Sequence, residues 1–307
     1  MSNIDYDVVV IGGGPAGLTA ALYALRADKS VLIIEKGGFG GQITHSPKIE
    51  NYPGFEMISG NELADKMVEQ VLAQGAEVEM DRATGIEKSD GGFAVKCEGC
   101  VRTGKTVIIA TGAKHRQLGV EGEDELVGEG ISYCAVCDGA FYKGQHVAVI
   151  GGGNSALQEA VLLSEGCSRV SVIQNLGFLT GEERLAAKLR ERDNVDFTFN
   201  TVVAGFESEN GSLKAVKLKN AETGEESKMY LDGIFVAIGL VPENEAFADA
   251  AGLNEYGYID ADERCTTATP GIFCAGDCRS KGVRQIATAV ADGATAALAA
   301  CRFIDSL

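Results

Sequence analysis

The chain has 307 residues, of which 45% are apolar and 23% charged, and its formal net charge is −17. This length suits about two domains, and this composition supports packed cores and excludes an intrinsically disordered chain. The acidic balance argues against a nucleic-acid partner, because binding phosphates requires clustered Lys and Arg.

The N-terminus has no basic start and no cleavable apolar segment before the strand-like run 8–11. No stretch of about 18 residues is purely apolar, so we expect no membrane span. The nine cysteines are odd in number and unevenly spaced, and a chain of this length does not need disulfide staples. These features indicate a cytoplasmic protein with one or two working thiol pairs.

The first elements form a dinucleotide-binding pattern. Residues 7–11 read as a buried parallel strand, 18–27 as a helix, and 31–34 as a second strand that ends at Glu35. Between them, Gly12, Gly14 and Gly17 match G-x-G-x-x-G, in which the glycines allow a tight turn, approach of a pyrophosphate, and close packing of helix on strand. Glu35 follows Gly12 by 23 residues (35 − 12), where a carboxylate can accept from ribose hydroxyls.

The pattern then recurs. A helix is expected at 60–75, followed by strands at 76–80, 85–88, 93–97, 101–105 and 107–110. A second strand–glycine loop–helix begins at His146, with Gly151-Gly152-Gly153 as its loop, and Ala237-Ile238-Gly239 echoes Ala110-Thr111-Gly112. We therefore interpret the chain as an imperfect duplication.

The tail returns to the first domain, with a strand at 271–277 that ends in Asp277 and an Ala-rich helix at 285–300. Polar residues and Pro interrupt the apolar pattern near 114–120 and 240–248. We predict a discontinuous dinucleotide-binding domain, 1–116 and 245–307, and an inserted domain, 117–244. The fold class is α/β, with two Rossmann-like three-layer domains, the second inserted into the first.

A Cys-x-x-Cys motif, Cys134-Ala135-Val136-Cys137, lies between the two glycine loops. These cysteines can close a small disulfide ring at a helix start, where N–H groups favour thiolate. A second motif, Cys97-Glu98-Gly99-Cys100, raises zinc as an alternative. The 33 residues between the motifs (101 to 133) exceed the about 15–20 of zinc pairs, so we expect no metal. Cys97 and Cys100 should flank a two-residue hairpin turn, as idle thiols or as an accessory disulfide.

Several short motifs carry a resemblance that covers nearly the whole chain. They are Gly40-Gly41-Gln42, Glu50-Asn51-Tyr52-Pro53-Gly54, Gly276-Asp277 and Arg284-Gln285-Ile286-Ala287. With these motifs the chain resembles the low-molecular-weight thioredoxin reductases, which have the flavoprotein disulfide reductase fold. The resemblance implies that the first site holds FAD and that the chain is a homodimer that reduces the thioredoxin disulfide.

The resemblance also implies residue roles. Glu35 would bind the adenosine ribose, Gln42 and Asn51 would line the flavin, and Asp277 would bond the ribityl–pyrophosphate region. Arg284, Gln285 and Ile286 would cap the flavin ring. The remaining cofactor-binding residues implied are Gly12, Gly14, Pro15, Ala16, Gly17, Lys36, Gly41, Thr111, Gly112 and Gly276.

For the redox pair, the resemblance implies that Cys137 faces the flavin and that Cys134 attacks the substrate disulfide. Asp138 would serve the proton transfers. Family members rotate the cysteine domain between flavin and substrate, so the two crossings could act as hinges.

The second glycine loop lacks the residues that hold a nicotinamide cofactor. Gly151 plus 23 gives Gln174, and the chain continues with Asn175-Leu176, where NADPH-using members of the family have His-Arg-Arg. The 2′-phosphate of NADPH needs cations, and NAD favours an acid. Three interpretations remain: a lost nicotinamide site, weak NADH binding through Gln174, or NADPH held by unfamiliar residues.

If the site is lost, the pattern resembles the ferredoxin-dependent flavin thioredoxin reductases, with reduced ferredoxin as donor. Ferredoxins are usually acidic, so docking would need local cations. The candidates are Lys114, His115, Arg116, Arg279, Lys281 and Arg284. A ferredoxin–nicotinamide reductase lacks the cysteine pair, and a non-catalytic flavin-binding regulator would not need it, so both are less favoured.

Overall fold

The computed structural model describes residues 4–46 and 49–307. The chain forms two compact units, Met1–Lys114 with Val241–Leu307 and His115–Leu240, so the second unit interrupts the first in sequence. The connecting segments β7 (Ala113–His115) and β16 (Leu240–Pro242) pair as a short two-stranded sheet.

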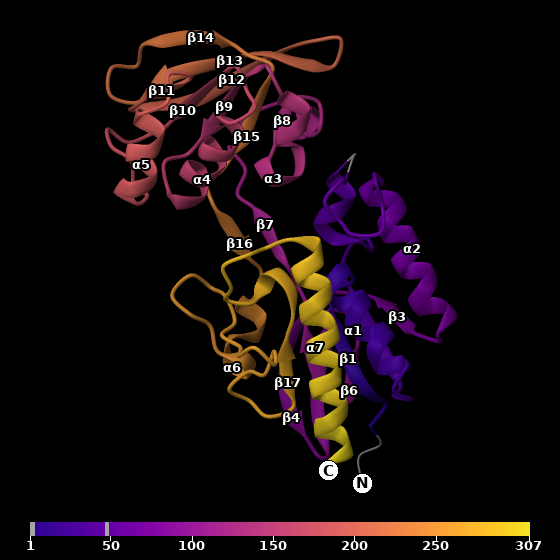
Figure 1. The fold of residues 1–307 in the computed structure, drawn as a ribbon. Helices are drawn as coiled ribbons and strands as arrows, with labels where there is room; N and C mark the ends of the chain where they lie inside the picture. Colours follow the sequence, from indigo (N-terminus) through magenta and orange to yellow (C-terminus); the bar gives the residue numbers. More distant parts are fainter. Residues whose placement is uncertain (1–3, 47–48) are drawn as a thin grey trace. The chain divides into compact units, whose positions relative to one another are not determined.

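The first unit is built on a parallel sheet in the order β3-β2-β1-β6-β17 (Figure 1). Its strands are β1 (Tyr6–Ile11), β2 (Val31–Glu35), β3 (Glu77–Met80), β6 (Val101–Ile109) and β17 (Ile272–Cys274). The first half of β6 pairs antiparallel with β5 (Gly92–Cys97), which pairs with β4 (Ala83–Ser89). The second half pairs parallel with β17.

Alternating side chains of β1 define three layers. Val8 and Val10 pack with helices α1 (Pro15–Leu25) and α7 (Ile286–Asp305) on one face. Val9 and Ile11 pack on the other face with residues of β4 and β5, because successive strand residues point to opposite sides. Helix α2 (Gly60–Ala73) begins at Ser59, whose hydroxyl accepts from the Glu62 N–H.

By length and composition alone, α7 is long and apolar enough to cross a membrane, with a mean hydropathy of 1.2. Its Ala289, Ala296 and Ala300 instead belong to the core that it shares with α1. A Cβ atom at Gly293 would lie 2.2 Å from the Ala16 carbonyl oxygen, so the two helices pack closely. These contacts are those of a core helix.

The second unit repeats this order of strands, β11-β10-β9-β15-β8, all parallel. The strands are β8 (Ile131–Ser132), β9 (His146–Ile150), β10 (Arg169–Ile173), β11 (Val195–Thr198) and β15 (Gly233–Val236). Helices α4 (Asn154–Leu163) and α5 (Glu183–Arg190) cover one face, and an antiparallel sheet of β12 (Thr201–Glu209), β13 (Ser212–Asn220) and β14 (Glu226–Tyr230) covers the other.

The predicted fold class is thus confirmed, and the differences are local. The two strands expected at 101–105 and 107–110 form the single strand β6, because Thr106 is fully buried and its hydroxyl donates to the Asp7 carbonyl, which keeps the chain extended. Helix α1 begins earlier, at Pro15, and α7 continues to Asp305. The remaining helical segments are short: η1 (Gly41–His45), η2 (Asp124–Leu126), α3 (Ala135–Asp138), η3 (Gly139–Tyr142), η4 (Glu245–Phe247), α6 (Ala248–Ala251) and η5 (Gly276–Cys278).

Candidate active site

The first glycine loop has the geometry of a dinucleotide cradle. Gly12 has φ 111°, and a Cβ atom there would lie 2.3 Å from the Ala110 carbonyl oxygen, whereas one at Gly17 would lie 1.9 Å from the Gly12 carbonyl oxygen. At Gly14 the nearest atom would be 4.0 Å away. Gly12 and Gly17 are therefore required for packing, and the space at Gly14 is open to a ligand.

Helix α1 presents an uncapped N-terminus to this space. Gly14 is the N-cap residue and makes no side-chain cap, and Pro15 follows at the first helical position. Backbone N–H groups of the first turn and the positive end of the helix dipole favour a phosphate here.

Glu35 ends β2 beside the loop. Its carboxylate accepts from the Gly13 N–H at 2.6 Å and from the Gly37 N–H at 2.8 Å. Each carboxylate oxygen has a second lone pair, so Glu35 can still accept from ribose hydroxyls. The Lys36 side chain is directed toward Glu243, with which it forms an ion pair, and not toward the glycine loop.

Gly40, Gly41 and Asn51 connect the loop to the start of α7. The Gly40 N–H donates to the Gly13 carbonyl at 2.8 Å, and a Cβ atom at Gly41 would lie 3.4 Å from the Gly14 Cα atom. Asn51 donates to the Gln285 side chain at 3.2 Å. Gln285 is the N-cap of α7 and forms a capping box with Thr288. The Gln42 side chain is exposed.

The hydrogen-bonding environment of Asp277 shows whether this unit has a place for FAD. Its Oδ1 atom is buried and accepts no hydrogen bond from the described residues, and burial raises the pKa of the carboxyl. Lys281 Nζ lies 3.4 Å from this oxygen, within ion-pair range but without hydrogen-bond direction. A buried oxygen without a donor is expected where a bound hydroxyl group normally completes the site. Together with Gly14, it fits a dinucleotide.

Thr111 and Gly112 follow β6 at the same end of the sheet. The Thr111 hydroxyl donates to the side chain of Asn244 at 2.9 Å, and Asn244 donates to the carbonyls of Gly257 and Cys278 at 2.9 and 3.0 Å. Asn244 is fully buried. Sequence reasoning missed it, because no motif surrounds it.

In the second unit, Cys134 and Cys137 form a disulfide. Cys134 is the N-cap of α3, and its sulfur accepts from the Cys137 N–H at 3.2 Å. Both cysteines are half-buried, and Val136 between them is exposed. The pair therefore lies at a helix start, as the motif predicted.

Asp138 lies directly behind the disulfide in the same short helix. Its Oδ2 accepts from the Ser132 hydroxyl at 2.6 Å, and its buried Oδ1 accepts from none of the described residues. Burial raises the pKa of the carboxyl, and the Ser132 hydrogen bond opposes this. Such a group can hold a proton nearer to neutral pH than an ordinary Asp.

A second carboxyl, Glu159 on α4, lies under the same helix and was missed by sequence reasoning. It accepts from the Ala135 N–H, and its Oε2 is buried without a partner among the described residues. Burial raises its pKa to about 8. In the sequence, Gln158-Glu159 looks like an ordinary solvated helix face.

The second glycine loop differs from the first. A Cβ atom at Gly152 would lie 2.5 Å from the Gln174 amide, and the buried Gln174 donates to the Phe178 carbonyl at 3.2 Å. The side-chain amide of Gln174 therefore forms its hydrogen bonds within the loop 174–178.

The N-terminus of α4 adjoins a later segment of the chain. A Cβ atom at Gly181 would lie 3.0 Å from the Asn154 backbone N, and the Asn154 side chain accepts from the Glu182 N–H at 2.7 Å. Segment 180–182 therefore lies beside the first turn of α4, whose Asn154 and Ser155 remain exposed and whose N-cap Gly153 makes no side-chain cap.

Cys97 and Cys100 flank the two-residue turn between β5 and β6, as predicted, and are free thiols. The other free cysteines, Cys167, Cys265, Cys274, Cys278 and Cys301, are buried.

The comparisons with known proteins agree with this geometry. Residues 6–293 match the family described as Pyridine nucleotide-disulphide oxidoreductase. A thioredoxin reductase of Bacillus subtilis is 43% identical over 302 residues, 98% of this chain and 96% of the relative. The crystal structure of thioredoxin reductase from Streptococcus pyogenes has a TM-score of 0.94 at 41% identity, covering 98% of this chain and 99% of that one.

A further relative, named a 34.2 kDa protein in the rubredoxin operon of Clostridium pasteurianum, is 40% identical over 301 residues, 97% of each chain. The chain therefore belongs to the pyridine nucleotide-disulphide oxidoreductase family and, within it, to the low-molecular-weight thioredoxin reductases.

Proposed function

We propose that this enzyme reduces the disulfide of thioredoxin through Cys134 and Cys137, with FAD in the first unit and reduced ferredoxin as electron donor. The disulfide at the start of α3, beside a buried carboxyl, is the observation that carries the disulfide chemistry. The relatives named thioredoxin reductase support the choice of substrate.

The residues that would hold FAD follow from the cradle. The open space at Gly14 and the N–H groups of α1 would accept the pyrophosphate, and Glu35 the adenosine ribose. Asp277 Oδ1 would accept a hydroxyl, and the capped start of α7 at Gln285 would face the flavin ring. FAD supplies the capacity to take electrons singly and deliver them in pairs.

At the dithiol, the thiolate of Cys134 would attack one sulfur of the thioredoxin disulfide, and the other sulfur would leave as a thiolate. Attack by the Cys137 thiolate on the mixed disulfide would re-form the Cys134–Cys137 bond and release reduced thioredoxin. Asp138 would hold a proton for the leaving sulfur, because its buried carboxyl has a raised pKa.

The ferredoxin assignment is supported by the second glycine loop. Gln174 is buried in its own loop, and no cation occupies 174–176. One relative's name connects it with an operon for rubredoxin, an electron carrier. NADH or NADPH as donor is the competing proposal.

Most of the cations considered for ferredoxin docking are already engaged. Lys114 pairs with Glu243, and Arg279 and Lys281 pair with Asp292. Arg284 stacks over the Tyr258 ring at 4.2 Å. The exposed Arg116 has no ion pair among the described residues and is the better candidate, although one cation is a weak docking site.

Anaerobic flavin spectroscopy tests the donor. The FAD-loaded enzyme is mixed in parallel with NADH, NADPH and enzymatically reduced ferredoxin. We expect bleaching by ferredoxin only. Rapid bleaching by NADPH would refute the donor and leave the disulfide chemistry intact, whereas a Cys134→Ser variant that still reduces thioredoxin would refute the dithiol.

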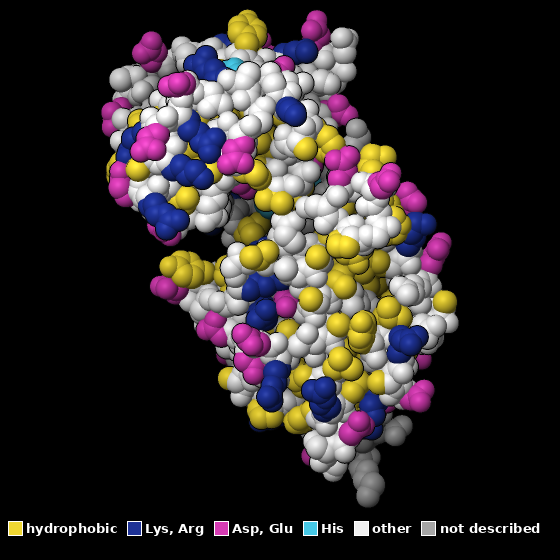
Figure 2. All heavy atoms as spheres, viewed as in Figure 1, with side chains coloured by type: hydrophobic (Ala, Val, Ile, Leu, Met, Phe, Trp, Pro, Cys, Tyr) yellow, Lys and Arg dark blue, Asp and Glu magenta, His cyan; other side chains and the backbone are white. Residues whose placement is uncertain are grey.

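We further propose a cytoplasmic homodimer. Figure 2 shows hydrophobic side chains gathered over α7 in the first unit, and Leu298 of α7 and Tyr23 of α1 are exposed by 42% and 41%. Such side chains suit a subunit interface. Sedimentation equilibrium showing a monomer at micromolar concentration would reject the dimer.

A further inference from the structure

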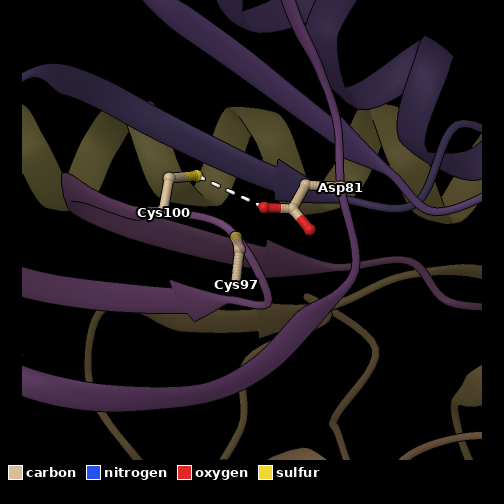
Figure 3. A group of neighbouring side chains, drawn as sticks. All are labelled: Asp81, Cys97 and Cys100. Carbon is tan, nitrogen blue, oxygen red and sulfur yellow. Dashed lines mark hydrogen bonds between the residues drawn. The ribbon is translucent and has the colours of Figure 1, made fainter.

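Three potential metal ligands meet in the first unit just after β3, where the Asp81 N–H donates to the Glu35 carbonyl at 3.0 Å. Cys97 and Cys100 flank the β5–β6 turn, and Asp81 follows the end of β3 (Figure 3). One ligand atom from each residue lies within 4.8 Å of the other two. All three residues are half-buried, so a bound ion would be partly shielded from water.

The Asp81 carboxylate is already oriented toward the thiols. Its Oδ1 accepts from the Arg82 N–H at 2.7 Å, and its Oδ2 accepts from the Gly99 N–H at 3.0 Å and from the Cys100 thiol at 3.5 Å. These backbone donors hold the carboxylate as outer hydrogen bonds hold a metal ligand.

The charged side chains around Asp81 would allow a cation to bind. Among the ion pairs of residues 4–46 and 49–307, none involves Asp81. The two nearby arginines are both paired, Arg82 with Glu98 and Arg102 with Glu79. No basic side chain therefore neutralises the carboxylate between the two thiols.

We propose that Asp81, Cys97 and Cys100 bind a zinc ion, with water as the fourth ligand. Two sulfurs and one carboxylate oxygen suit zinc, whereas Mg²⁺ and Ca²⁺ prefer oxygen alone. At Zn–S distances of about 2.3 Å, two sulfurs of a tetrahedral site lie about 3.8 Å apart. The ligand atoms, now within 4.8 Å, need to move by about 1 Å at most. Binding releases the two thiol protons to solvent.

This site differs from the zinc alternative that the sequence raised. There, Cys97 and Cys100 would share an ion with Cys134 and Cys137, which instead form their own disulfide. The third ligand comes from Asp81, 16 residues before Cys97 (97 − 81). The ion would join the end of β3 to the β5–β6 turn.

The experiment uses the full-length, FAD-loaded chain carrying Cys134→Ser and Cys137→Ser, so that the other motif cannot bind metal under reductant. After addition of Zn²⁺ and gel filtration, metal content is measured by plasma mass spectrometry. Affinity is measured by competition with a chelator, and ligands are identified by zinc-edge X-ray absorption. We expect one zinc per chain, with two sulfur neighbours at about 2.3 Å.

Matched variants locate the ligands. Adding Cys97→Ser and Cys100→Ser should weaken zinc binding by about 100-fold or more, and Asp81→Asn by about 10-fold or more. Asp65→Asn, at an exposed acid on α2, and Cys167→Ala, at a buried thiol, should change nothing.

Four results would overturn the proposal, and the first three concern zinc binding itself. These three are zinc binding no tighter than micromolar in the starting chain, stoichiometric zinc retained without Cys97 and Cys100, and equal affinity in the Asp81→Asn and Asp65→Asn variants. A Cys97–Cys100 disulfide that forms in preference to zinc under the same reductant would also reject it.

Discussion

The buried Glu159 carboxyl should make the stability of the second unit pH-dependent, and Glu159→Gln should remove that dependence. Burial favours the protonated carboxyl and raises its pKa to about 8 from 4.5. Between these values the folded chain holds a proton that the unfolded chain has lost. Stability therefore falls as pH rises from about 4.5 to about 8, and levels off above that.

The size of the effect follows from the width of this window. The shift is about 3.5 pKa units (8 − 4.5), and each unit corresponds to about 1.36 kcal/mol. The ceiling is thus about 5 kcal/mol of lost stability at pH 9, and water entry and relaxation bring the expected value to about 2–4 kcal/mol. Glu159→Gln keeps the shape of the side chain and cannot ionise, so it should recover this amount at pH 9 and almost nothing at pH 4.5.

Urea unfolding at several pH values, with the Cys134–Cys137 disulfide intact, measures this directly. The control is Glu191→Gln, at an exposed position in the same unit, which should follow the unsubstituted protein at every pH. The reasoning is refuted if Glu159→Gln and Glu191→Gln give parallel stability curves from pH 5 to pH 9.

Further substitutions separate folding from cofactor binding. Gly17→Ala should destabilise the first unit by about 3 kcal/mol or more in thermal unfolding, since its Cβ would lie 1.9 Å from a backbone oxygen. Gly14→Ala has room in the fold and should instead weaken FAD retention during ultrafiltration. Asp277→Asn should also lower FAD affinity, by about tenfold, with an unchanged circular dichroism spectrum; FAD binding as tight as before would contradict its role. Gln285→Ala should lower stability by about 1 kcal/mol through loss of the α7 cap.

The sequence predicted those features that depend on residues close together in the chain. Gly12 to Gly17 and Glu35 belong to one strand–loop–helix–strand unit, and Cys134 to Asp138 to one turn of helix. The hairpin turn at Glu98-Gly99 was predicted for the same reason.

Features that depend on distant segments were not predictable. Glu159 looks like a solvated helix position until α3 packs over it, and Asn244 gains its partners from residues up to 133 positions away. Asp81 carries no motif, and it reaches the β5–β6 turn because β4 pairs with β5 in a register that sets Ala83 opposite Cys97. Tertiary contacts determine each of these environments.

The buried side chain of Gln174 limits how this enzyme could be re-engineered. Placing arginines at 174–176 would provide charge for a 2′-phosphate, but Gln174 would be lost from its buried place under Gly152. Charge for a 2′-phosphate would therefore have to be introduced together with a new conformation of the loop 174–178, which the Gln174 side chain now holds. Stepwise substitution would pass through variants that have lost the old packing before they gain a new ligand.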